Sequence, residues 1–239
     1  MQMNDINFKN TPFSILIEEV YELIELRKEY TNKSYRERKL AADYQYHSSI
    51  ADNIFDEASG RNTSSDQPWP GEILALVIDP LYAPAILTVG SYEYIYGRKN
   101  EAMNHFLSLT KLPKDTEDLF GIIDKAAEFM IENKDYENAI IIYISAVNAF
   151  PQTGLFHNGL SNCYGMLGTF SKAIEEAKSA VNLDNNNHIY LNDLGWSLVE
   201  AGHYEEAQPI LEKAIRLSPP GYSLPRNNLI KLQKRKGKI

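Results

Sequence analysis

The sequence predicts an all-α protein, a solenoid of paired antiparallel helices with a helical extension before it and a capping helix after it. Two observations lead to this fold class. Shifting the chain against itself by 34 residues aligns three segments, 120–153, 154–187 and 188–221. Within each segment, apolar residues recur twice at helical spacing, with a turn between the two runs. Repeats of this kind stack side by side and bury a continuous core.

Small residues recur in one register through the three segments, which we call units. The two most regular columns are Ala139, Ala173 and Ala207, and then Ala146, Ala180 and Ala214. A larger side chain would hold two crossing helices apart, because protein interiors are closely packed. We therefore expect these alanines at buried helix crossings.

Three further columns mark the turns and ends of the predicted helices. They are Lys134, Gly168 and Gly202, then Tyr136, Phe170 and Tyr204, and then Pro151, Asn185 and Pro219. Glycine favours the tight turn, and the aromatic residue after it covers the groove between the two helices. Proline ends the second helix because it has no N–H to continue the hydrogen bonding.

The combination of these columns resembles the tetratricopeptide repeat. The unit that matches best contains Leu191, Leu194, Gly195, Leu198, Gly202, Tyr204, Ala207, Ala214 and Pro219. Each position alone is degenerate, but the set repeated over three units is specific. The resemblance implies a right-handed superhelix of helix pairs. It also implies a concave surface that takes an extended peptide or a partner helix, lined by the first helix of each unit.

The predicted organisation has three parts. Residues 1–70 form an N-terminal helical segment and loop, with helices expected at 13–26 and about 34–58 and a polar connector at 59–71. Residues 71–221 form the repeat array, which also contains a more diverged unit at 83–116 and the end of a helix at 74–80. Residues 222–239 form a basic capping helix and tail.

The C-terminal segment differs in charge from the rest of the chain. Residues 222–239 carry a charge of +6 and the remaining residues −14, which gives the net charge of −8. The segment places four apolar residues on a helix with a basic outer side, namely Leu224, Leu229, Ile230 and Leu232. We expect a solvating cap on the last repeat. A tail that binds nucleic acid or anionic lipid is the alternative for these cations.

The sequence indicates no enzyme, no cofactor and no metal site. Cys163 is the only cysteine, which excludes an internal disulfide and a cysteine-based zinc site. The five histidines are scattered without metal-ligand spacing, and no phosphate-binding or nucleophile motif occurs. The negative net charge argues against general binding of nucleic acid or membrane surfaces. With neither a signal peptide nor a membrane-spanning stretch recognised, a cytoplasmic protein is expected.

Candidate partner-binding residues follow from the resemblance, at the positions that line the concave surface. They are Asp124, Glu128 and Glu132 in the first unit, Leu155, Asn158, Asn162 and Met166 in the second, and Ile189, Asn192, Trp196 and Glu200 in the third. The asparagines offer a donor and an acceptor to a peptide backbone, and Trp196 is expected as an exposed aromatic anchor. The acids predict a neutral or basic ligand rather than an acidic chaperone tail.

Two function classes remain open at this stage. The first is a non-catalytic scaffold or adaptor, of the co-chaperone or assembly-factor kind, that binds a protein or peptide in the groove. The second is a self-associating assembly or regulatory protein, similar to secretion chaperones, that acts through residues 1–70. The sequence leaves the identity of the partner and the oligomeric state open.

Overall fold

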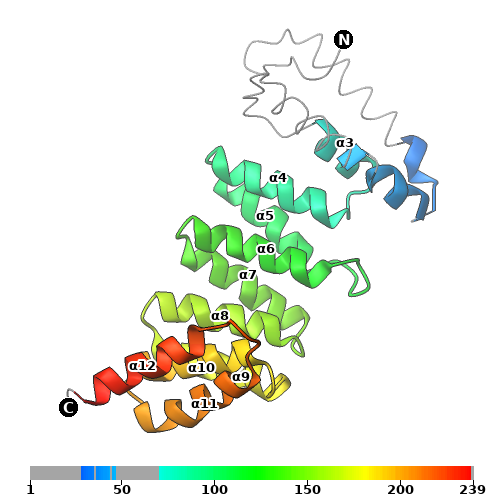
Figure 1. The fold of residues 1–239 in the computed structure, drawn as a ribbon. Coiled ribbons are helices and arrows are strands. Elements are labelled where there is room, and N and C mark those ends of the chain that lie inside the picture. The colour runs from blue at the N-terminus through cyan, green and yellow to red at the C-terminus, as the bar shows by residue number, and fades with distance from the viewer. Residues whose placement is uncertain (1–27, 35, 44, 47–69, 238–239) are drawn as a thin grey trace, which may run out of the picture. The chain divides into compact units, whose positions relative to one another are not determined.

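The computed structural model describes residues 28–34, 36–43, 45–46 and 70–237 (Figure 1). These residues form helices, turns and short connections, with no strand among them. The predicted all-α fold class is therefore confirmed. The chain divides into two compact units, residues 1–122 and 123–239.

The described residues of the first compact unit include helices α3 (Pro70–Ile78), α4 (Ala83–Ile95) and α5 (Lys99–Leu109). Helix α4 packs against both α3 and α5. Residues 28–31, 36–43 and 45–46 are also helical. Their side chains help to form a core cluster whose buried members are Ala42, Ala75, Ile78, Tyr82 and Ala85.

The predictions for the N-terminal segment are covered only in part. The helix expected at 13–26 lies outside the described residues, as does much of the helix expected at 34–58 and of the connector at 59–71. At the end of that connector, Pro70 and Gly71 already belong to α3. The domain boundaries at residues 70 and 221, and a role of residues 1–70 in self-association, stay predictions.

The second compact unit is built from successive helix pairs. Helix α6 (Leu119–Glu132) runs across the boundary between the two compact units. It is followed by α7 (Tyr136–Ala149), α8 (Gly154–Met166), α9 (Phe170–Leu183), α10 (His188–Glu200), α11 (Tyr204–Leu217) and α12 (Leu224–Lys236). Helices α8 and α9 pack as one pair and α10 and α11 as the next, and α10 also packs against α9 (Figure 1).

The alanine columns occupy the positions expected of close helix crossings. All six, Ala139, Ala146, Ala173, Ala180, Ala207 and Ala214, have no exposed surface. Gly195 of α10 also allows a close approach of two helices, since a Cβ atom on it would lie 2.5 Å from Cδ2 of Leu211 on α11. The repeat register read from the sequence thus coincides with the packing register.

The turn between the two helices of each unit has one backbone conformation, whatever residue occupies it. Gly168 and Gly202 have φ angles of 71° and 84°, and Lys134, at the same repeat position, has a φ of 60°. At all three turns the following N–H donates to a carbonyl five residues back, as from Asp135 to Met130. Lys134 differs from the two glycines in residue type but has the same backbone conformation. Its left-handed conformation is unfavourable for a residue that has a side chain.

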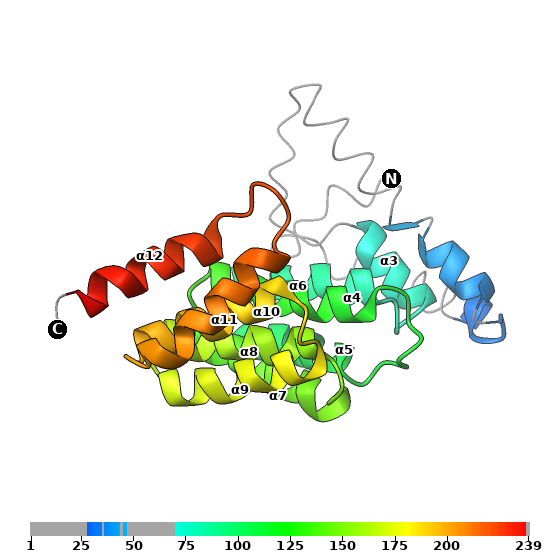
Figure 2. The ribbon, with the colours of Figure 1, turned by 60° about the horizontal axis from the view of Figure 1, so that its bottom comes forward.

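Helix α12 continues the stack beyond the last helix pair. It packs against α11 and also against α10, and Figure 2 shows it running beside them. Leu232 is fully buried in a cluster with residues of α10 and α11, and Leu229 packs at the edge of that cluster. Leu224 and Ile230 stay exposed, so only part of the predicted apolar side is covered.

Candidate partner-binding face

The candidate residues lie on α6, α8 and α10, the first helices of the three units. We call the part of these helices that carries them the first-helix face. Its charge is one-sided: α6, α8 and α10 together contain a single lysine, Lys125, and five carboxylates. The carboxylates are Asp124, Glu128, Glu132, Asp193 and Glu200.

Asp124 is a partly buried carboxylate held by a tyrosine. Its Oδ1 accepts a hydrogen bond from the Tyr143 hydroxyl at 2.8 Å. The Tyr143 ring fits where Gly159 has no side chain, since a Cβ atom there would lie 2.2 Å from the ring. Burial raises the pKa of Asp124 to about 6, with a small addition from Glu128, while the bond from Tyr143 opposes the rise. Ionised Asp124 is thus costly at neutral pH, and a nearby cation would stabilise it.

A second carboxylate, Asp193, gathers the three asparagines of the first-helix face. Its Oδ2 accepts from Nδ2 of Asn158 at 2.9 Å and from Nδ2 of Asn162 at 3.3 Å. Its Oδ1 accepts from Nδ2 of Asn192 at 2.9 Å. Burial raises the pKa of Asp193, and these three bonds act against the rise. The amides expected to meet a ligand therefore already bind within the protein, and both Asn158 and Asn192 are buried.

Sequence reasoning missed Asp193 because it occupies no characteristic column of the repeat. A signal for it exists in the spacing. Asn158 and Asn162 precede Asp193 by 35 and 31 residues, close to one repeat length, so that neighbouring first helices bring them together. Residues separated by about one repeat are candidates for contact in any stacked array.

Trp196 is not the exposed anchor that the sequence suggests. It is half-buried, and its ring lies over Gly165 of the preceding first helix, where a Cβ atom would come within 2.4 Å of it. The exposed apolar side chains of the first-helix face are instead Met166 and Ile189, which are 57% and 41% exposed. Leu155 is half-buried.

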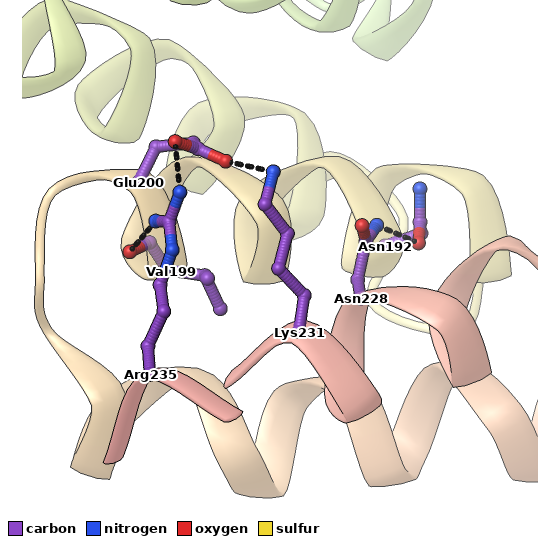
Figure 3. A network of polar contacts seen from close by, with 6 residues as sticks. All are labelled: Asn192, Val199, Glu200, Asn228, Lys231 and Arg235. Carbon is purple, nitrogen blue, oxygen red and sulfur yellow. Dashed lines mark hydrogen bonds and ion pairs between the residues drawn. The ribbon is translucent and has the colours of Figure 1, made fainter. Parts of the chain in front are cut away.

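The far end of the first-helix face is covered by α12 (Figure 3). Glu200 pairs with Lys231 and, through Oε2, with Nη2 of Arg235 at 3.0 Å. Nη1 of Arg235 donates to the Val199 carbonyl at 3.0 Å. Burial raises the pKa of Glu200, but the bonds from Lys231 and Arg235 outweigh it, and the pKa lies below its ordinary value. Glu200 is thus engaged inside the protein.

Asn192 is engaged in the same way, because its Oδ1 accepts from Nδ2 of Asn228 at 3.0 Å. The basic side of α12 therefore does not face outward throughout, as the sequence suggested. Lys231 and Arg235 meet α10, and Lys236 pairs with Glu205 of α11 at 2.7 Å. The predicted cap is held by ion pairs as well as by Leu232.

The described residues contain no cluster of three or more histidine, cysteine, aspartate or glutamate side chains that could hold a metal ion. Cys163 has no exposed surface, and burial, helped by the charge of Asp124, raises the pKa of its thiol to about 12. His157 is bound to Glu176 at 2.7 Å. In the part of the chain that the structure covers, no helix combines the length and apolarity needed to cross a membrane.

Comparison with known proteins returns one repeat family. The family model described as "Tetratricopeptide repeat" matches residues 189–220. Small glutamine-rich tetratricopeptide repeat-containing protein 2 from Mycosarcoma maydis is 28% identical over 86 residues, which cover 36% of this chain and 24% of that protein. The protein of the same name from Saccharomyces cerevisiae is 23% identical over 118 residues, covering 49% of this chain and 34% of the relative. The matches thus span only a quarter to a third of these relatives.

Among solved structures, the first TPR of Spaghetti (RPAP3) bound to the HSP90 peptide SRMEEVD is similar with a TM-score of 0.45 and 20% identity. The similarity covers 48% of this chain and 90% of that one.

Proposed function

Because the chain is a tetratricopeptide-repeat protein, we propose that it is a non-catalytic adaptor that binds a neutral or basic peptide or partner helix on its first-helix face. One observation carries the proposal. Glu128 and Glu132 of α6 are exposed and make no ion pair within the described residues, and Asp124 beside them has a raised pKa. A ligand with N–H donors or positive charge would stabilise all three.

The binding surface consists of α6 and α8 and the beginning of α10. Asp124, Glu128, Glu132 and Asn162 supply its polar part. Its apolar part comes from Leu155, Met166 and Ile189, which are exposed or half-buried on the same helices. Asn192 and Glu200 are left out of this surface because α12 binds both of them. Asn158 and Trp196 lie beneath this surface, where Asn158 donates to Asp193 and the Trp196 ring packs over Gly165.

An acidic peptide is disfavoured on this surface. Bringing a carboxylate terminus beside Glu128 and Glu132 places like charges together, and their repulsion grows as water is excluded. Further, Asp124 would have to stay protonated or accept a second negative neighbour. The proposed ligand is therefore the opposite in charge of a chaperone C-terminal tail.

Fluorescence anisotropy with two labelled peptides tests the proposal. One is a short lysine-rich amphipathic peptide, and the other is SRMEEVD. We expect the basic peptide to bind and its affinity to fall as salt is raised, because exposed charges are screened. The double variant Glu128→Lys, Glu132→Lys should weaken it by about tenfold or more.

The matched control changes the same charge away from the first-helix face. Glu137 and Glu175 are exposed on the second helices α7 and α9, and Glu137→Lys, Glu175→Lys should leave the affinity near that of the wild type. Equal weakening by the control would show that only the overall charge matters. Tighter binding of SRMEEVD than of the basic peptide would refute the proposed ligand class.

A further inference from the structure

Helix α12 occupies, on the last helix pair, the place that a first helix takes on the pair before it. Helix α10 packs against α9 and α8, and α12 packs in the same manner against α11 and α10. Yet no second helix follows α12 within the described residues. We call the surface beneath it the α12 seat. It is formed by Asn192, Leu198, Val199, Glu200, Glu205 and Leu211.

The α12 seat has an apolar floor. Leu232 has no exposed surface there and lies in one cluster with Leu198, Val199 and Leu211. Apart from Leu232, only Pro225 of α12 is buried. Leu232 thus makes the main apolar contact, and Leu229 packs at the edge of the same cluster.

The rim of the seat is polar and selects positive charge. Glu200 binds Lys231 and Arg235, and Asn192 accepts from Asn228 (Figure 3). Glu205 binds Lys236. The Arg235 guanidinium also meets the Val199 carbonyl at the C-terminal end of α10, where the helix dipole favours a cation. The seat therefore recognises a helix with asparagine at position i, lysine at i+3, leucine at i+4, arginine at i+7 and lysine at i+8.

The contacts that keep α12 in the seat are specific, but they stabilise the docked helix only modestly. The side chains of Lys231 and Arg235 are 44% and 34% exposed, and ion pairs at such exposure contribute little. No side chain caps the N-terminus of α12, and a 13-residue helix is only marginally stable alone. The connection from α11 passes through Pro219, Pro220 and Gly221 and has no helical structure.

We propose that the α12 seat is a docking site for a basic amphipathic helix of a partner protein, which replaces α12 there. The helix carries the spacing that α12 displays, with one buried leucine between a lysine and an arginine. The seat contains none of the residues of the surface proposed on α6, α8 and the beginning of α10, and neither proposal depends on the other. Displacement of α12 leaves the core of the last repeat covered, because the incoming leucine takes the place of Leu232.

A labelled peptide with residues 222–237 of this chain tests the exchange on the full-length protein. Wild-type protein should bind it weakly, because α12 fills the seat for most of the time. The double variant Lys231→Glu, Arg235→Glu loosens α12, and its apparent affinity for the peptide should rise about tenfold or more as the open fraction grows. Adding Glu200→Lys to this variant should abolish binding. The basic peptide then meets a like charge, whereas the protein's own α12 regains an opposite one.

The matched control is Arg226→Glu, Lys234→Glu, which makes the same charge change on α12. Both residues are exposed and form no ion pair within the described residues. This variant should bind the peptide no better than the wild type, and Glu128→Lys, Glu132→Lys on α6 should have no effect. Failure of the proposed function and failure of the exchange are therefore distinguishable.

Hydrogen exchange of residues 224–236 in the wild type gives a second readout that requires no substitution. Saturating peptide should increase exchange in this segment if the peptide replaces α12. Unchanged exchange would overturn the proposal, and so would a control variant that binds as tightly as Lys231→Glu, Arg235→Glu. A concentration-dependent dimer that dissociates when the peptide is added would identify a second copy of the chain as the occupant. This result would also refute a helix of a partner protein.

Discussion

Helices α6 and α10 are first helices two units apart, and each carries a glutamate at the same repeat position, Glu132 and Glu200. Glu200 binds Lys231 and Arg235 of the helix that packs beside it. Glu132 is exposed and makes no ion pair within the described residues, and the helix that follows its pair, α8, carries no lysine or arginine. The difference lies in the neighbouring helix rather than in the glutamate.

The pKa values of Asp124 on α6 and Glu200 on α10 are shifted in opposite directions, because only Glu200 has cationic partners. Burial raises the pKa of Asp124 on α6, and its one tyrosine partner does not compensate. On α10 burial acts on Glu200 as well, but two cations outweigh it and lower the pKa. The fold thus compensates Glu200 with two cations and leaves the acids of α6 to solvent or a ligand. Uncompensated groups of this kind are more frequent at functional sites.

The largest expected effect concerns the helix that distinguishes α10 from α6. Leu232→Ala removes the one fully buried leucine of α12 and should lower the free energy of unfolding by about 2–4 kcal/mol, measured by chemical denaturation. Ile230→Ala, on the exposed side of the same helix, should change it by less than about 0.5 kcal/mol. Equal losses from both variants would mean that α12 is not docked through Leu232.

The second prediction concerns Asp124. Because its pKa in the folded protein lies above the unfolded value, the folded state holds the proton more tightly, and stability falls as the pH rises from about 4 to 7. Asp124→Asn cannot titrate but still accepts from Tyr143. It should therefore gain about 1–2 kcal/mol at neutral pH, after allowance for partial exposure, and much less at about pH 4.

Thermal unfolding at both pH values measures this difference. Glu132→Gln is the matched control, since Glu132 is exposed and does not contribute to the raised pKa of Asp124, so its substitution should give no pH-dependent gain. A gain for Asp124→Asn of the same size at both pH values would show that titration of Asp124 is not its cause.

The third prediction compares the two equivalent glutamates directly. Glu200→Gln weakens two ion pairs and should cost about 1 kcal/mol at neutral pH, whereas Glu132→Gln should cost nothing measurable. Since the folded pKa of Glu200 is depressed, its contribution is present above the unfolded value and is lost as the pH falls through the folded one. Urea denaturation over this acidic range, at low and high salt, checks both points. A similar cost for both variants would remove the contrast between α6 and α10.

The smallest expected effect concerns the turns within the two units. Lys134→Gly relieves a left-handed backbone that Gly202 already accommodates, and should stabilise the protein by about 0.5–1 kcal/mol despite the greater freedom of the unfolded chain. The reverse change, Gly202→Ala, should destabilise it by a similar amount. A destabilised Lys134→Gly would show that the lysine side chain contributes more than its backbone costs.

The helix pairs could be predicted from the sequence because packing within a pair requires the same type of residue at the same position of every unit. An alanine at a crossing or an aromatic residue at the start of a second helix is needed in every unit, so Tyr136, Phe170 and Tyr204 begin α7, α9 and α11. Contacts between units follow no such column. Whether Trp196 is exposed depends on Gly165 of another helix, and the amides near it depend on Asp193.

The side of α12 that meets the array was beyond prediction for a related reason. Helical spacing places Lys231, Leu232 and Arg235 near one another, but it does not say which neighbour they meet. The side of α12 that meets the array depends on Glu200, which lies at the end of a helix predicted to bind the ligand. Opposite charges separated by roughly one repeat length are the signal that a reading of stacked arrays should include.

Cys163 gives the molecule a built-in reporter of its own opening. It is the only thiol of the chain, it has no exposed surface, and its pKa of about 12 keeps it protonated and unreactive in the folded state. A thiol reagent therefore modifies the protein only when α8 separates from its neighbours. The modification rate reports how often α8 opens in unlabelled wild-type protein. A slower rate with bound peptide would show that the peptide makes this opening less frequent.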